Sequence, residues 1–241
     1  MILFLKRLFL FLFIISLLII LYKKNYLISK LENIIIIFSE YSDNVLKEVY
    51  ISGRVNENKS NITEALNVKI GDSLFNINLK EIRKNLNKLS WVQDSKIYIL
   101  PLGQLEIEIF EYIPFVRYID KKEKYFLINN NGIKFKEINS YEFPDLFKLR
   151  GKDALLKVNE LSLIMNKLKL LNLDIINVER IDSRRWNIYL KEGYFIKLPH
   201  IDSIKSLDAL YELDNNINYD NLIFIDLRIK NRISIKYKNI D

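Results

Sequence analysis

The sequence predicts an α+β protein with one N-terminal transmembrane helix, a small βααββ domain, and a mainly antiparallel β-domain with flanking helices. Three observations support this fold class. One long segment near the N-terminus carries no charge, several segments repeat apolar residues at helical spacing, and others alternate apolar with polar residues as half-buried strands do. The length of 241 residues suits an anchor followed by one or two modest domains.

The anchor is predicted from Leu8 to Tyr22, which contains no charged residue and is flanked on both sides by basic residues. Fifteen helical residues rise only about 22 Å, less than the ~30 Å of a hydrocarbon core. The apolar residues 2–5 and the long stems of the flanking lysines make up the difference. No small-residue cleavage site follows, which favours an uncleaved anchor over a signal peptide.

This anchor sets the expected organisation of the chain. We expect a short cytoplasmic N-terminus at residues 1–7, a transmembrane helix at 8–24, a stalk at 25–44, and two domains at 45–112 and 113–241. Because only a few residues precede the helix, the simplest arrangement translocates the C-terminal body out of the cytoplasm.

Composition excludes several classes of function. The chain has no cysteine, so it forms no disulfide, no thiolate metal site and no cysteine nucleophile. The net charge is +7, but the lysines are interleaved with acidic residues and do not gather in a basic block. We therefore expect no nucleic-acid partner.

Candidate catalytic side chains are few. His200 is the only histidine, and one histidine without cysteine cannot build the usual zinc sites. Glu106, Glu108 and Glu111 could suggest a carboxylate pair for glycan cleavage. However, Glu106 and Glu108 alternate with apolar residues, which indicates the solvent face of a half-buried strand. No Gly-x-Ser-x-Gly elbow, Walker loop or Gly-x-Gly-x-x-Gly is present. We expect no enzymatic activity, no cofactor and no metal.

The first domain reads as strand, helix, helix, strand, strand. A strand is predicted at 45–51, and Asn61 with Glu64 resembles the capped start of a helix. Asn78 is predicted to cap a second helix whose apolar face repeats at 3-4-3 spacing, with Leu79, Ile82, Leu86 and Leu89. Strands at 91–100 and 104–109 then flank a Pro-Leu-Gly turn.

The second domain is predicted to be rich in strands. An Asn-Gly turn joins the strands of a hairpin, and helical spacing from Leu155 to Leu171 predicts a helix facing the core. Ser203 is a candidate cap for a later helix. The expected strands lie at 125–128, 133–135, 175–181, 186–190, 194–198, 222–227 and 232–237.

These residues resemble the FtsQ/DivIB family of cell-division proteins, with a POTRA domain followed by a β-domain. The stretches that carry the resemblance are Val49–Gly53, Gly71–Phe75, Leu89–Val92, Leu100–Pro101, Glu111–Pro114, Arg185–Ile188, Gly193 with Lys197–Pro199, and Ile225–Arg228. Two positions depart from the family pattern. The family usually carries Asp where this chain has Asn78, which still caps a helix, and Arg where it has Tyr112.

The resemblance implies an inner-membrane protein at the division septum that binds FtsB and FtsL and helps control septal peptidoglycan synthesis. It implies that FtsB adds a strand to the C-terminal strand pair. The residues implied in this contact are Arg228, Ile229, Asn231, Ile233, Ile235 and Tyr237. Ile229 stands where an aromatic is often found, and Tyr237 where some members carry Trp.

Alternatives remain open at this point. Residues 232–237 could simply complete the domain's own sheet, as most strands do. A POTRA-containing membrane-biogenesis or export component is an alternative function, although such proteins typically carry tandem POTRA units or a barrel. An anchored cell-wall hydrolase is a third class.

Overall fold

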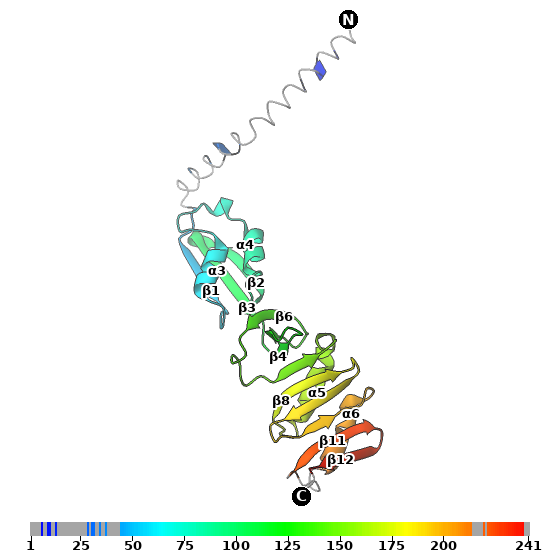
Figure 1. Cartoon of the computed structure of the whole chain (residues 1–241). Helices are drawn as coiled ribbons and strands as arrows, with labels where there is room; N and C mark the ends of the chain where they lie inside the picture. Colours follow the sequence, from blue (N-terminus) through cyan, green and yellow to red (C-terminus); the bar gives the residue numbers. More distant parts are fainter. Residues whose placement is uncertain are drawn as a thin grey trace. The chain divides into compact units, whose positions relative to one another are not determined.

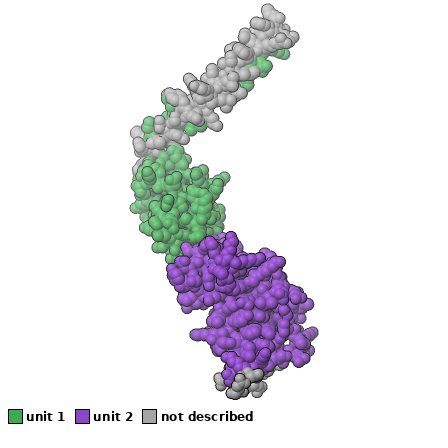
Figure 2. Space-filling view, viewed as in Figure 1, with its two compact units in different colours: residues 1–111 green, residues 112–241 purple. Residues whose placement is uncertain are grey.

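The computed structural model describes residues 44–213, 219 and 221–238, together with isolated positions (6, 9, 10, 13, 28, 30, 31, 34 and 37). The chain forms two compact units, residues 1–111 and 112–241, which Figure 2 shows in green and purple. The transmembrane helix predicted at 8–24 and the stalk at 25–44 lie almost entirely outside the described residues. Within the described part, no helix combines the length and apolarity needed to cross a membrane.

The first unit is a three-stranded sheet in the order β1-β3-β2 with two helices (Figure 1). β3 runs parallel to β1 and antiparallel to β2. The alternate residues Leu105, Ile107 and Ile109 of β3 share one core with both helices, which therefore pack on the same face of the sheet. The elements are β1 (Glu48–Ser52), α3 (Lys59–Leu66), η1 (Leu74–Asn76), α4 (Leu79–Leu86), β2 (Val92–Leu100), η2 (Pro101–Gly103) and β3 (Gln104–Glu111).

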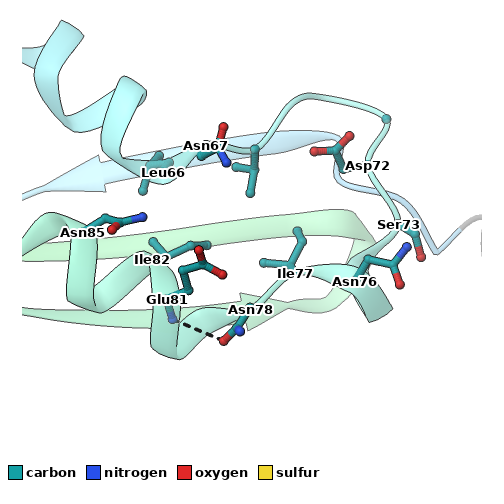
Figure 3. Close-up of a pocket in the computed structure, with 12 residues that line it drawn as sticks. Leu66, Asn67, Asp72, Ser73, Asn76, Ile77, Asn78, Glu81, Ile82 and Asn85 are labelled. Atoms are coloured by element: carbon teal, nitrogen blue, oxygen red, sulfur yellow. Dashed lines mark hydrogen bonds between the residues drawn. The ribbon is translucent and has the colours of Figure 1, made fainter. Parts of the chain in front are cut away.

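The helix caps confirm one prediction and correct another. Asn78 caps α4, because its side chain accepts a hydrogen bond from the N–H of Glu81 (Figure 3). The cap of α3 is Asn58, not Asn61, so this helix begins earlier than predicted. Asn61 lies inside the helix, where its amide donates to the carboxylate of Glu57.

The first strand is shorter than predicted. β1 begins at Glu48, not Val45. Residues 44–46 instead pair with the loop before η1, where the N–H of Leu46 donates to the carbonyl of Asp72 and Val45 bridges Ser73. A period-two pattern cannot distinguish a neighbouring loop from a neighbouring strand as the partner.

Gly53 follows β1 directly, and replacing it with alanine tests this packing. Its φ is +76°, and an added Cβ would lie 2.1 Å from the carbonyl oxygen of Ile109. Gly71 also has a positive φ, +95°, but its Cβ would meet nothing within 4 Å. Both alanine variants incur backbone strain, so Gly53→Ala is expected to lower the free energy of unfolding by about 1–3 kcal/mol more than Gly71→Ala. Urea unfolding followed by Trp91 fluorescence, in a Trp186→Phe background, measures the difference, and equal losses would contradict the predicted clash.

The second unit is one nine-stranded sheet in the order β12-β11-β10-β9-β8-β7-β4-β5-β6 (Figure 1). Five of its eight pairings are antiparallel, which confirms a mainly antiparallel domain, and the other three are parallel. Its strands are β4 (Val116–Ile119), β5 (Tyr125–Ile128), β6 (Lys134–Ile138), β7 (Lys148–Gly151), β8 (Ile175–Ile181), β9 (Arg185–Leu190), β10 (Phe195–Lys197), β11 (Leu222–Ile229) and β12 (Arg232–Tyr237).

The helices of this unit are η3 (Leu155–Lys157), α5 (Val158–Lys169), α6 (Ser203–Ser206) and α7 (Asp208–Leu213). The predicted core face of α5 is confirmed, since its apolar residues pack with Trp186 and Ile188 of β9. The buried residues of this face are Val158, Leu161, Ile164, Met165 and Leu168.

Ser203 does not cap the later helix. It is the first residue of α6, Asp202 occupies the cap position, and no side chain there accepts a capping bond. The Ser203 hydroxyl instead donates to Glu160 of α5 at 3.2 Å. It thus joins the two helices, which is a long-range contact that no local pattern indicates.

Candidate functional site: the β12 edge and its groove

β12 is an edge strand of the nine-stranded sheet. It pairs only with β11 among the described strands, and both are drawn in red in Figure 1. In an antiparallel edge strand, alternate residues direct their N–H and C=O groups away from the sheet. Such groups can pair with an added strand.

The six predicted contact residues divide into three groups. Arg228, Ile229 and Asn231 lie at the turn between β11 and β12, where Asn231 has a positive φ of 58° and Ile229 is 59% exposed. Ile233 and Ile235 are half-buried and pack against the unit's own core. Tyr237 lies at the far end of β12, opposite Leu222.

A groove of about 840 Å³ lies beside this turn. We call it the turn groove. Two segments far apart in sequence line it, the loop and helices after β10 and the β11–β12 turn. Ile201 is 73% exposed on the first segment. The lining residues are Pro199, His200, Ile201, Asp202, Lys205, Ser206, Asp208, Ala209 and 227–233.

The turn groove is predominantly basic. Four of its side chains are cationic, and two are acidic. One acid and one cation are already paired, Asp208 with Lys167 and Arg228 with Asp226. The cations are Lys205, Arg228, Lys230 and Arg232.

Asp226, two residues before Arg228 in β11, fixes the position of the Arg228 side chain. The guanidinium of Arg228 donates to both carboxylate oxygens, with Nη2 at 2.6 Å from Oδ2 and Nε at 2.8 Å from Oδ1. Burial alone would raise the pKa of Asp226, but the hydrogen bonds from the Arg228 side chain and backbone N–H outweigh it and lower the pKa below 3.8. The bidentate geometry therefore holds Arg228 in a defined direction.

The lowered pKa of Asp226 predicts a pH-dependent contribution to stability. A group with a depressed folded-state pKa stabilises the fold above its unfolded pKa, and this contribution is lost as the pH falls through the folded value. We expect Asp226→Asn to lose less stability than the unsubstituted chain between pH 6 and pH 3. Urea unfolding at the two pH values measures the difference, and equal losses would contradict the expectation.

The other edge of the sheet is less suited to strand addition. Three of the five residues of β6 are charged, compared with two of the six in β12. Charged side chains on an edge disfavour pairing with another strand. Phe135 of β6 also stacks on Tyr112, with ring centroids 4.9 Å apart. A ring contact therefore occupies the position where the family usually carries Arg.

The side chains considered for catalysis are dispersed. His200 is exposed, with Nδ1 2.9 Å from the carbonyl oxygen of Arg184. Glu106 and Glu108 lie on the face of β3 opposite its buried residues. Glu111 accepts backbone N–H bonds from residues 55–57; burial would raise its pKa, but these bonds lower it overall. In the described part of the chain, no three His, Cys, Asp or Glu side chains group as metal ligands.

The first unit carries a depression of about 340 Å³ between the end of α3 and the start of α4 (Figure 3). Four asparagines and two carboxylates line it, and the cap of α4 forms part of its wall. Two of its polar residues serve the local fold, because Asp72 accepts from the N–H of Lys69 and Asn78 caps the helix.

Comparison with known proteins identifies both units. Residues 45–112 match the family model "POTRA domain, FtsQ-type", and residues 117–228 match "Cell division protein FtsQ/DivIB, C-terminal". The second match ends at Arg228, before β12.

Curated relatives extend the similarity along most of the chain. Cell division protein FtsQ of Rickettsia bellii is 32% identical over 196 residues, covering 79% of this chain and 72% of that protein. FtsQ of Rickettsia felis is 29% identical over 194 residues, with the same coverage. FtsQ of Caulobacter vibrioides is 24% identical over 193 residues, covering 79% of this chain and 64% of that protein. The chain therefore belongs to the FtsQ/DivIB family of cell-division proteins.

Proposed function

We propose that this protein is a membrane-anchored division protein that holds FtsB and FtsL at the septum and thereby helps control septal peptidoglycan synthesis. It acts by binding, without catalytic turnover. The observation that supports this proposal most directly is that β12 is an edge strand beside the turn groove. The segment 8–24, uncharged from Leu8 to Tyr22, supplies the anchor in the inner membrane and places both units in the periplasm.

Strand addition at β12 explains how the contact forms. A partner strand satisfies the outward N–H and C=O groups of β12, and these main-chain bonds supply affinity without requiring particular side chains. Ile233 and Ile235 contribute indirectly, because they pack against the core of the unit and so hold β12 in place. Arg228, Ile229, Asn231 and Tyr237 are the residues that meet the partner's side chains.

The turn groove explains how the partner is chosen. Its excess of cations favours a partner segment with acidic residues and disfavours a basic one. Exposed Ile201 and Ile229 supply apolar contacts at the same place. Main-chain pairing at β12 and charge matching in the groove thus act on two parts of one partner.

The alternative of a POTRA-containing export component is disfavoured, because residues 117–228 match the FtsQ/DivIB C-terminal domain rather than a second POTRA unit or a barrel. The experiment that tests the function is depletion of the protein in its own cells. We expect filamentation and loss of FtsB and FtsL from midcell. Normal septation with both partners in place would overturn the proposal.

A further inference from the structure

The outward face of α5 carries a second set of apolar side chains that the core does not explain. Leu156, Leu163 and Leu170 are 82%, 56% and 73% exposed. They lie in η3, in α5 and at the C-cap of α5, on the side of the helix opposite its buried residues. Exposed apolar side chains that gather on one surface mark an interaction site.

The spacing of these leucines is regular. They recur every seven residues, and the exposed Asn159 and Asn166 stand between them, so the steps along the helix are 3-4-3-4. Seven residues return to within about 20° of the same direction on an α-helix. Asn159, Leu163, Asn166 and Leu170 therefore follow one line about 17 Å long on α5. Leu156 precedes this line in η3, across the non-helical backbone of Lys157. We call these five residues the leucine seam.

We propose that the leucine seam docks an amphipathic α-helix of another protein, with its own apolar stripe at heptad spacing and acidic flanks. Leu163 and Leu170 lie about 10 Å apart along α5, which matches the knobs of a facing helix. Alternate side chains of a strand are only about 7 Å apart and would fall out of register. The two asparagines offer amide groups that fix the register of the facing helix.

Charge beside the seam selects the acidic partner. Lys157 and Lys169 are exposed, and each is next to an end leucine. Neither forms an ion pair with any residue that the structure describes. Glu160 is turned away from the seam, because its carboxylate accepts hydrogen bonds from Trp186 and Ser203.

The same charges disfavour a second copy of this chain as the occupant. Two seams packed antiparallel place Lys157 of one copy beside Lys169 of the other, and parallel packing places each lysine beside its own equivalent. Like charges in these positions are repulsive. A glutamate on a different protein at either position converts the repulsion into attraction.

The size of the seam limits its strength. A single helix packed along about 17 Å buries much less than the roughly 800 Å² per partner of a standard interface. The seam is therefore a weak contact alone, and it gains strength where another contact already holds the assembly together. This contact is separate from β12 and does not depend on the function proposed for that strand.

The test uses the full chain in detergent micelles and two labelled synthetic helices of about four heptads. Both have leucine at the seam-facing positions; one has glutamate at the flanking positions and the other lysine. Fluorescence anisotropy is expected to show saturable binding of the acidic helix, at least tenfold tighter than the basic one. Leu163→Glu is expected to weaken it at least tenfold, and Leu163→Ala by a smaller factor.

Leu102→Glu is the matched control, because Leu102 is 80% exposed in the other unit. It should bind the acidic helix as the unsubstituted chain does, and circular dichroism checks that every variant is folded. Equal binding of the two helices, or binding that Leu163→Glu leaves unchanged, overturns the proposal. A dimer in sedimentation equilibrium, or binding to phosphatidylglycerol vesicles, that Leu163→Glu abolishes would assign the seam to a second copy or to the membrane instead.

Discussion

The double variant Ile229→Glu/Tyr237→Glu is expected to bind FtsB about a hundredfold more weakly, which corresponds to about 2.7 kcal/mol. Both side chains are exposed, Ile229 by 59% and Tyr237 by 39%, so the substitutions remove little packing from the fold. They place two charges where a partner strand on β12 would exclude water, and an unpaired charge there is costly. Isothermal titration calorimetry of the full chain in detergent against the periplasmic part of FtsB measures the loss.

The matched control is Ile176→Glu/Tyr141→Glu in the same unit. These two side chains are 50% and 75% exposed, and they lie outside β12 and the turn groove. The control makes the same chemical change and is expected to keep the affinity for FtsB. An equal loss in both double variants would show that general charge, not this edge, determines binding.

Glu160→Ala is expected to lower the free energy of unfolding of the second unit by about 3–5 kcal/mol. Its carboxylate accepts from Nε1 of Trp186 at 3.1 Å and from the hydroxyl of Ser203 at 3.2 Å. It also lies 3.9 Å from Nη1 of Arg180, whose side chain is only 3% exposed. Removing the carboxylate leaves the Trp186 N–H and the Ser203 hydroxyl without this acceptor, and it leaves the buried guanidinium of Arg180 without its nearby counter-charge. Urea unfolding followed by Trp186 fluorescence, in a Trp91→Phe background, measures the loss.

Two further variants separate this cause from a general effect of losing a glutamate. Glu192→Ala removes an exposed glutamate in the β9–β10 turn and is expected to change stability by less than about 0.5 kcal/mol. The double variant Glu160→Leu/Arg180→Leu removes both charges and is expected to lose less than Glu160→Ala alone. If Glu160→Ala behaved as Glu192→Ala does, the buried network would contribute nothing.

Elements with a strong local period were predictable from the sequence. The strand at 175–181 was predicted with the bounds that β8 has, and the core face of α5 was predicted residue by residue. Asn78 was predictable as a cap because an apolar helical repeat follows it directly. In each case the residues that determine the element are neighbours in the chain.

Elements that depend on distant partners were not predictable. β4 and β7 carry no clear alternation, and they pair with each other in parallel across an intervening hairpin. The true cap of α3, Asn58, precedes a weakly amphipathic helix, so the pattern placed the start at Asn61. The pairing of these strands and the start of this helix are decided by packing between segments, which local sequence patterns do not contain.

Only part of the candidate site was predictable from the sequence. The strand pair at 222–237 and its turn were predicted, whereas the contribution of residues 199–209 to the turn groove was not. That segment meets the turn because β10 pairs in parallel with β11, and α6 and α7 form the connection between them. A parallel pairing requires a long crossover, whose contacts no short motif indicates.

Strand addition at β12 is tested most directly by hydrogen–deuterium exchange of the full chain with and without FtsB. An added strand protects the outward amides of the strand that it joins. We expect slower exchange in residues 232–237 when FtsB is bound, together with slower exchange at the β11–β12 turn. Exchange in 232–237 that stays unchanged at saturating FtsB, with protection elsewhere in the chain, would contradict the account.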